Sequence, residues 1–250
     1  MSVASASRTI KFISKAGTYT ALIMSPSGDL FIDYEGTTND VTAVYPNFAT
    51  TKPILYFVCM SSRVAEGVAD PDAMEYYFNG EKITFSGGVS TGTFAGYFQT
   101  VAPSGDQLYY GLQILKDISA LAGYAPATIK MVATVSYGTQ SDTIQATYTI
   151  PIQQATGSSY RVTIAAGDTK NFVITAKGGS CILKAMAYQS GNALTKDLTY
   201  VWEKMGASGW ETITGATSQT LTVYADDINT YGEYRVHVKR AGAEIGTDIQ

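Results

Sequence analysis

His237 is the one histidine in the chain and therefore the first residue to consider for catalysis. A histidine base needs a nucleophile and an orienting carboxylate within hydrogen-bond reach, and no Gly-Xaa-Ser-Xaa-Gly sequence adjoins it. One histidine and two widely separated cysteines also cannot supply a tetrahedral zinc site. Apolar and polar residues alternate from Tyr234 to Lys239, which points His237 outward from a half-buried strand. We expect a surface histidine.

Carboxylates form two local clusters that could serve a hard cation or acid catalysis. Asp70 and Asp72 stand close to Glu75, and Asp226 precedes Asp227. Calcium prefers several oxygen ligands at defined spacing, and that full spacing is absent here. Aspartate is also favoured at turns, where it bonds to its own backbone. The sequence predicts no catalytic residue, no metal site and no cofactor.

A glycine- and serine-rich segment with aromatic residues is the candidate binding loop. Within residues 86–104, Phe94, Tyr97 and Phe98 stand among Gly, Ser and Thr, a mixture typical of recognition loops. The alternative is an edge hairpin whose three rings pack inward, which the alternation favours. Either interpretation places the segment as an insertion between strands.

Composition and periodicity indicate which elements would carry these residues. Charged residues are 15% of the chain, whereas glycine contributes 24 residues and tyrosine 18, a profile of many short strands and turns. Tyr234, Val236 and Val238 should face a core, and Trp202 should lie between two sheets. The predicted fold class is all-β, with two tandem sandwiches at residues 36–152 and 155–250.

A weak internal repeat supports this division of the chain. The first copy is longer, both in the candidate loop and near residues 121–127, and Met131 takes the place of Tyr234 there. The matched segments are Asp40–Val44 with Arg161–Ala165, Ile54–Met60 with Cys181–Ala187, Tyr76–Phe78 with Tyr200–Trp202, and Asp117–Ser119 with Asp227–Asn229.

Residues 1–35 read as a separate N-terminal piece. A basic arm comes first, and apolar runs at 18–24 and 30–34 then flank a Ser-Pro-Ser-Gly-Asp turn, which predicts a β-hairpin. An isolated hairpin is marginal in water, so it should dock on a partner. The candidate anchoring residues are Arg8, Lys11, Lys15, Leu22 and Phe31.

Charge, hydropathy and cysteine usage exclude several partner classes. The net charge of −4, without a dense basic run, gives no electrostatic footprint for nucleic acid. No run of 18 apolar residues is present, which argues against membrane insertion. The N-terminus lacks the apolar block of a secretory signal, and Cys59 and Cys181 fall in different predicted domains, so we expect synthesis in a reducing compartment.

The second half of the chain resembles the immunoglobulin-like modules of tailed-bacteriophage virion proteins and bacterial surface adhesins. An aromatic strand centre is followed by a Gly-Xaa-Tyr-Xaa-apolar run that puts Val236 where antibody domains keep their second cysteine. The segment 18–28 is also similar to openings of tail and prophage proteins from Bacteroidetes hosts. The residues that carry the first likeness are Tyr200–Lys204, Trp210–Ile213, Gly215–Ser218 and Asp227–Tyr234.

This resemblance implies a non-enzymatic virion structural protein on the capsid exterior or tail, made in the host cytoplasm. Its partners would be other virion proteins in a multi-copy assembly, with a host-surface glycan as a further candidate ligand. A bacterial cell-surface adhesin and a carbohydrate-binding module are the alternatives.

Overall fold

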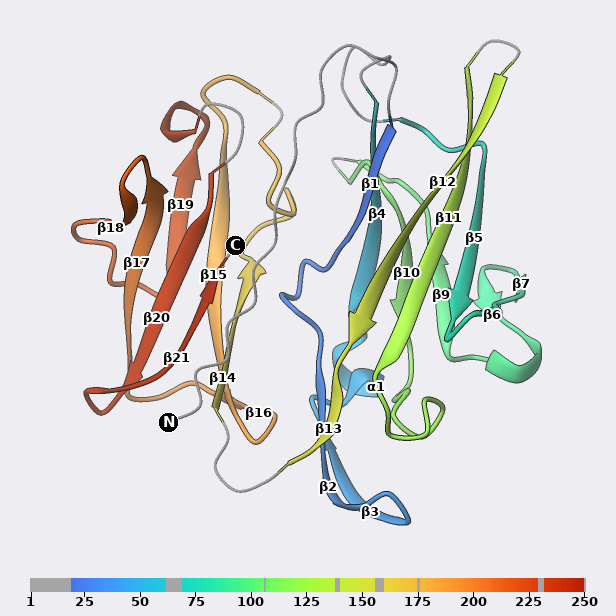
Figure 1. The fold of residues 1–250 in the computed structure, drawn as a ribbon, viewed down its shortest axis with the longest axis horizontal. Helices are drawn as coiled ribbons and strands as arrows, with labels where there is room; N and C mark the ends of the chain where they lie inside the picture. The colour runs from blue at the N-terminus through green and yellow to red at the C-terminus, as the bar shows by residue number, and fades with distance from the viewer. Residues whose placement is uncertain are drawn as a thin grey trace. The chain divides into compact units, whose positions relative to one another are not determined.

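β-Strands make up most of the chain in the computed structural model, which describes residues 19–61, 69–105, 107–137, 140–155, 160–174, 176–228 and 232–249. The predicted all-β class is therefore confirmed (Figure 1). The described residues form two compact units. The N-terminal unit contains residues 19–25 and 30–154, and the C-terminal unit contains residues 26–29 and 155–249.

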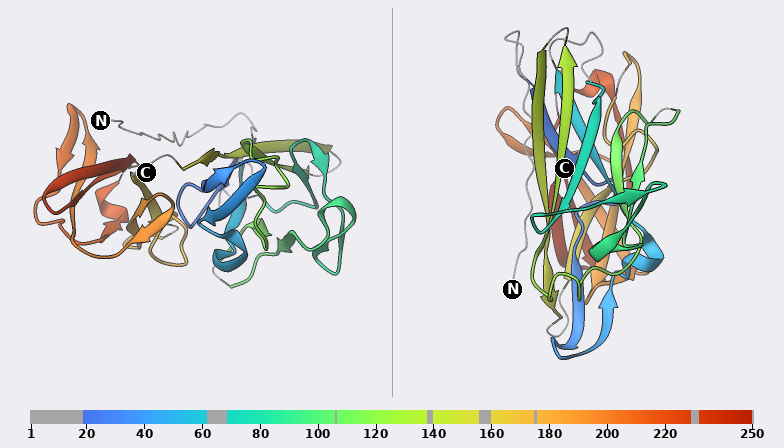
Figure 2. Two further views of the ribbon diagram at one scale, coloured as in Figure 1. Left: turned by 90° about the horizontal axis from the view of Figure 1, so that it is seen from below. Right: turned by 90° about the vertical axis from the view of Figure 1, so that its right-hand side faces the viewer.

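Two sheets enclose the core of the N-terminal unit. A six-stranded sheet has the order β1-β4-β10-β9-β8-β7, and a four-stranded sheet has the order β12-β11-β5-β6. Figure 2 shows β12, β11 and β5 side by side. In chain order, the strands of these two sheets are β1 (Tyr19–Met24), β4 (Ile54–Ser61), β5 (Ala73–Phe78), β6 (Glu81–Lys82), β7 (Phe85–Ser86), β8 (Val89–Ser90), β9 (Phe98–Val101), β10 (Tyr110–Ile114), β11 (Ala127–Tyr137) and β12 (Gln140–Ile150).

Strand alternation builds this core. Along β11 every second residue is buried, from Ala127 through Ile129 and Met131 to Val135, while the residues between them are partly exposed. Leu112 and Ile114 of β10 are completely buried in the same cluster. A short helix, α1 (Phe48–Thr51), contributes the buried Phe48 and is capped by the Asn47 side chain.

A third sheet of the N-terminal unit corrects the predicted N-terminal hairpin. β2 (Ile32–Thr37) pairs with β3 (Asp40–Tyr45) and, in parallel, with β13 (Ile152–Gln154), whereas β1 pairs with β4. The hairpin prediction was wrong because its turn does not join neighbouring strands. Residues 26–29 belong to the C-terminal unit, where the Ala166 amide donates to the Pro26 carbonyl at 2.7 Å.

The anchoring hypothesis also needs correction. It required apolar side chains at the N-terminus to lie exposed, but Phe31 is 3% exposed and Leu22 is partly buried, because β1 and β2 already pair within the chain. Arg8, Lys11 and Lys15 lie outside the described residues. The predicted boundary at residues 35 and 36 falls inside β2.

Two further sheets enclose the core of the C-terminal unit. One is a four-stranded sheet in which β14, β15 and β16 follow one another and β19 also pairs with β15; the other has the order β18-β17-β20-β21. The strands are β14 (Tyr160–Ala166), β15 (Ser180–Gln189), β16 (Asn192–Leu194), β17 (Leu198–Gly206), β18 (Gly209–Thr212), β19 (Thr220–Tyr224), β20 (Tyr234–Arg240) and β21 (Ala243–Ile249). A 3-10 turn, η2 (Ala225–Asp227), follows β19.

The aromatic centre of this core lies as predicted. Trp202 is 0% exposed, and its indole N–H donates to the Ser218 carbonyl at 2.9 Å, which satisfies its one polar atom. Tyr234, Val236 and Val238 are buried on β20, which confirms their inward direction. Cys59 and Cys181 are buried thiols in separate units, and burial raises the pKa of each to about 11.

The two units share one strand order. β1-β4-β10 corresponds to β14-β15-β19, and β12-β11-β5-β6 corresponds to β21-β20-β17-β18. The predicted match of Asp40–Val44 to Arg161–Ala165 was therefore wrong, because β1 takes that place. Met131 pairs with Tyr76 as Val238 pairs with Tyr200, so Met131 corresponds to Val238 and not to Tyr234.

Candidate functional site

The candidate loop of Phe94, Tyr97 and Phe98 is part of the core. Phe94 and Phe98 are 4% and 0% exposed, and their ring centroids lie 5.7 and 5.6 Å from that of Phe78. Tyr97 is partly buried beneath the Lys116 ammonium, 4.9 Å from its ring centroid. Neither phenylalanine is available to a ligand, which corrects the recognition-loop interpretation in favour of inward packing.

Gly88-Val89-Ser90-Thr91-Gly92 matches the nucleophile pattern Gly-Xaa-Ser-Xaa-Gly, although it lies far from His237 in the sequence. The structure gives Ser90 a different role. Its buried hydroxyl donates to the Phe94 carbonyl and accepts from the amides of Tyr97 and Phe98 at 3.1 and 2.9 Å. Ser90 thus holds the turn before β9. It is followed by the three-residue 3-10 turn η1 (Gly92–Phe94) and not by the α-helix that follows a catalytic nucleophile of this pattern.

The predicted carboxylate clusters serve the backbone and neighbouring side chains. Asp72 accepts from the Ser136 amide at 2.6 Å, and Asp227 accepts from the Tyr224 amide at 3.3 Å. Glu75 accepts from the Tyr77 hydroxyl at 2.6 Å and pairs with Lys82. In the described part of the chain, no three His, Cys, Asp or Glu residues are grouped so as to hold a metal ion.

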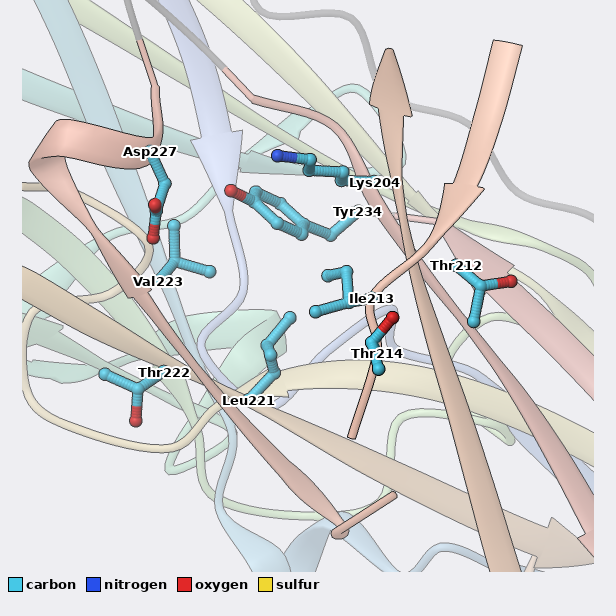
Figure 3. Close-up of a pocket in the computed structure, with 9 residues that line it drawn as sticks. All are labelled: Lys204, Thr212, Ile213, Thr214, Leu221, Thr222, Val223, Asp227 and Tyr234. Atoms are coloured by element: carbon cyan, nitrogen blue, oxygen red, sulfur yellow. The ribbon is translucent and has the colours of Figure 1, made fainter. Parts of the chain in front are cut away.

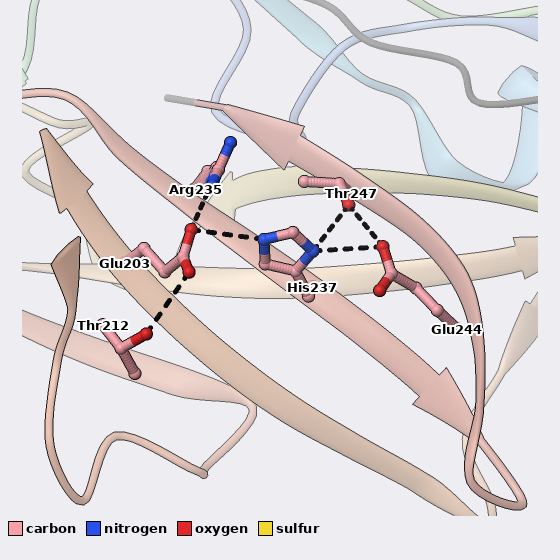
Figure 4. Close-up of polar contacts among 6 residues, drawn as sticks. All are labelled: Glu203, Thr212, Arg235, His237, Glu244 and Thr247. Carbon is pink, nitrogen blue, oxygen red and sulfur yellow. Dashed lines mark hydrogen bonds and ion pairs between the residues drawn. The ribbon is translucent and has the colours of Figure 1, made fainter. Parts of the chain in front are cut away.

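A polar network lies across the sheet β18-β17-β20-β21 (Figure 4). It is on the face opposite the buried Trp202, because Trp202 and Glu203 are consecutive residues of β17. Alternation on β20 places its polar side chains here, because its apolar residues fill the core. Partners come from each of the other three strands. The network consists of Glu203, Thr212, Arg235, His237, Glu244 and Thr247.

His237 is held at both ring nitrogens. Its Nε2 lies 3.3 Å from a Glu203 carboxylate oxygen, and its Nδ1 lies 3.1 Å from Glu244. The Thr247 hydroxyl is 2.9 Å from both the Nδ1 atom and the Glu244 oxygen. Arg235 pairs with Glu203 through its Nε atom. The histidine side chain is 22% exposed, so it is a partly buried bridge between two carboxylates.

The two carboxylates respond to this arrangement. Burial acts to raise the pKa of Glu203, but the hydrogen bonds and charges of Arg235 and His237 outweigh it and lower that pKa. The hydrogen bond from His237 is the main cause that lowers the pKa of Glu244, against a smaller effect of burial. Both groups are therefore held as carboxylates, the form that accepts hydrogen bonds.

The connectivity Thr247, His237, Glu203 is that of a hydrolase triad, but its surroundings differ. A catalytic hydroxyl must be free to lose its proton to the base, whereas the Thr247 hydroxyl also contacts the Glu244 carboxylate. The groups lie on a sheet face and not in the pocket of this unit. We interpret the network as a set of cross-strand ties between β17, β20 and β21.

Trp210 extends this face onto β18. The Arg235 guanidinium carbon lies 4.5 Å from the centroid of its ring, a cation–π contact, and the ring is partly exposed.

Sequence reasoning identified His237 as outward but missed its carboxylate partners. The available signal was the alternation on β17, which places Glu203 on the face opposite Trp202.

A pocket of about 290 Å³ opens between β18 and β19 of the C-terminal unit, and Thr212 belongs both to its lining and to the polar network. Its apolar side chains are Ile213, Leu221 and Val223, with Tyr234 beside them (Figure 3). Burial, with the Asp227 and Cys181 charges, raises the pKa of Tyr234 to about 12, so its hydroxyl stays protonated. The polar rim consists of Lys204, Thr212, Thr214, Thr222 and Asp227.

Comparison with known proteins identifies no family. No family model and no curated protein matches the chain. A crystal structure of the β-glucuronidase of Parabacteroides merdae is similar at 9% identity and a TM-score of 0.32, over 94% of this chain and 25% of that enzyme. The same enzyme with glycerol in its active site gives 8% identity, a TM-score of 0.32, and coverage of 95% and 24%. The chain spans about a quarter of that enzyme, and likeness at this level carries no argument about function.

Proposed function

We propose that this chain is a non-enzymatic structural protein of a tailed-bacteriophage virion, built from two tandem immunoglobulin-like sandwiches. It would be made in the host cytoplasm and assembled in many copies with other virion proteins, on the capsid exterior or the tail. The proposal combines the resemblance of residues 160–249 to virion modules with the strand order of both units.

The shared strand order is the observation that carries the proposal. In this proposal β14, β15 and β19 correspond to strands A, B and E of an immunoglobulin-like sandwich, and β18, β17, β20 and β21 correspond to C′, C, F and G; the pairing order supports this correspondence. The N-terminal unit repeats this order. The fold alone does not set the function, so the virion role in this proposal is taken from the resemblance of residues 160–249.

The side chains that could take part in catalysis also favour a structural role. Ser90 supports a turn, Glu75 pairs with Lys82, and His237 ties two carboxylates across strands. We expect no turnover of glycan, ester or peptide substrates. Turnover that is lost in Thr247→Val or His237→Gln, but kept in the surface control Lys239→Gln, would contradict the non-enzymatic assignment.

Location is tested directly on particles. Gold-labelled antibodies against the purified chain should decorate native phage particles at many regularly spaced positions in electron micrographs. Absence of the label from particles, together with its presence on intact bacterial cells, would replace the virion assignment by the surface-adhesin alternative.

The described part of the chain contains no helix that is long and apolar enough to cross a membrane.

A carbohydrate-binding role is the second candidate, and Trp210 favours it. The Trp210 ring could stack on the apolar face of a sugar, because it lies beside charged hydrogen-bonding groups. The sugar hydroxyls would then bond to carboxylates of the network such as that of Glu203. Trp202 is buried, so a change in tryptophan fluorescence on glycan addition would report Trp210. We expect saturable quenching by a host-surface glycan, lost in Trp210→Ala; glycans that leave the fluorescence unchanged would remove this candidate.

A further inference from the structure

The two units differ at one sheet edge. In the N-terminal unit, β10 lies between β4 and β9, with Leu112 opposite Thr100 and Ile114 opposite Phe98. Its counterpart in the C-terminal unit, β19, pairs with β15, and no other strand of the described chain pairs with it. The segment between Phe78 and Asp117, which is longer than its counterpart after Trp202, supplies the strands that cover β10.

The outward backbone groups of β19 follow from the bonds that it makes. The Gln219 carbonyl accepts from the Ala185 amide at 2.9 Å, and the Ala225 amide donates to the Gly179 carbonyl at 2.9 Å, so the odd-numbered residues face β15. In an antiparallel pair the direction alternates, which turns the N–H and C=O groups of Thr220 and Thr222 away from β15. The Tyr224 amide on the same side is taken by Asp227.

Apart from the Asp227 contact at its end, β19 has no charged side chain, proline or bulge that would protect this edge from pairing. Edge strands are commonly protected by charged side chains, proline or a bulge. β19 reads Thr-Leu-Thr-Val-Tyr, has β-branched residues at three of its positions, and shows no register shift against β15. Tyr224 is 53% exposed at its end, and the apolar pocket of Ile213, Leu221 and Val223 lies beside it.

We propose that β19 is a self-association edge, on which the β19 strand of a second copy pairs antiparallel about a twofold axis through Thr222. The central Thr222 pair would then exchange both backbone hydrogen bonds. Leu221 would lie opposite Val223 of the second copy on the inner face, next to the pocket. Thr220 would lie opposite Tyr224 of the second copy, so no like charges meet across the pair.

The sequence of the strand favours a second copy over an unrelated strand. A twofold contact is the commonest symmetry of soluble oligomers and requires a self-complementary patch. β19 meets this requirement, because its central residue is a threonine and its two apolar residues flank that centre. The inference deepens the proposed multi-copy function, yet it concerns the chain in solution and is tested without particles.

The test places a charge at residue 222, the one position of β19 that would lie opposite the same residue of the second copy. The full chain, followed by sedimentation velocity up to about 1 mM because small edge contacts bind weakly, should form dimers. Thr222→Lys and Thr222→Glu should each be monomeric, since like charges would lie directly opposite. An equimolar mixture of the two variants should dimerise again. Thr143→Lys, an exposed threonine on β12, is the matched control and should dimerise like the wild type.

A second variant separates edge pairing from charge. Thr222→Pro removes an outward N–H group and leaves the bonds between β19 and β15 in place, so the unit should stay folded, as tryptophan fluorescence would show, and remain monomeric. A wild type that is monomeric throughout, or dimers that persist in both charged variants, would overturn the proposal. Monomeric charged variants that fail to dimerise when mixed would also overturn it, because the contact would not be twofold at Thr222.

Discussion

The N-terminal and C-terminal units follow one strand order but treat the same sheet edge in opposite ways. β9 covers β10 and inserts Phe98 into the core, whereas β19 leaves a pocket of about 290 Å³ beside Leu221 and Val223. The difference shows that a longer segment between two corresponding strands can cover a sheet edge instead of forming a binding loop. The module without the insertion keeps the edge that a partner can use.

The outer faces of the two corresponding four-stranded sheets also differ. On the N-terminal unit, Glu75 and Lys82 form a pair with side chains 42% and 52% exposed. On the C-terminal unit, Glu203 and Arg235 are 15% and 25% exposed, and His237 joins them to Glu244. The second network is better shielded from solvent, so its ion pairs should be weakened less by salt.

Equivalent core positions should have equally large effects on stability. Trp202→Ala in the C-terminal unit and Phe78→Ala in the N-terminal unit should each lower the free energy of unfolding by about 3–5 kcal/mol, as truncation of buried aromatic rings does. Trp210→Ala should cost less than about 1 kcal/mol because its ring is at the surface. Urea unfolding followed by circular dichroism checks this. Equal costs for the two tryptophans would contradict the inward placement of Trp202.

The two edges should differ in the same experiment. Phe98→Ala should cost about 3–5 kcal/mol, since its ring is fully buried, whereas Leu221→Ala should cost only about 1–2 kcal/mol beside an open pocket. The measurement is made at low micromolar concentration, where self-association does not contribute. If Leu221→Ala were as costly as Phe98→Ala, the edge at β19 would already be covered in the monomer.

The shielded network should give the C-terminal unit a pH dependence. The pKa of Glu203 is lowered in the folded state, so its stabilising effect is present above the unfolded value of about 4.3 and is lost as the pH falls through the folded value. Glu203→Gln should therefore cost about 1 kcal/mol near pH 7 and almost nothing well below pH 4.

Glu75→Gln is the matched control for that titration. The pKa of Glu75 is also lowered, first by its hydrogen bond from Lys82, but the pair is exposed and should be screened by 1 M salt. Urea titrations across pH at two salt concentrations would compare the variants. If Glu75→Gln lowered the free energy of unfolding more than Glu203→Gln does, the network on the C-terminal unit would not be the better shielded of the two.

The sequence predicted those parts of the structure that depend on local periodicity. Alternation placed Val236 and Val238 inside and His237 outside, and the aromatic pattern located Trp202 in a core. These predictions succeed because successive side chains of a strand point to opposite faces, so residues two apart share a face whatever the strand pairs with.

The errors of prediction concern pairings between distant segments. The turn after Met24 suggested a hairpin, but β1 pairs with β4. A turn signal does not specify with which strand the preceding strand pairs. Glycine and serine around Phe94 suggested a recognition loop as one of two interpretations, and the inward packing that alternation favoured is the one observed, with the rings beside Phe78. The partners of His237 come from two other strands, β17 and β21, so no short sequence motif could reveal the network.

Amide hydrogen exchange at β19 tests the difference between the two edges most directly. In dilute solution the Thr222 amide should exchange much faster than that of Val223, whose N–H faces β15, while Gly111 to Gln113 on β10 should all be protected by their two neighbouring strands. At high protein concentration the Thr222 amide should become protected as the second copy pairs with it. A Thr222 amide that is as protected as that of Val223 in dilute solution would contradict the open edge, and one that stays unprotected at every concentration would contradict its use by a second copy.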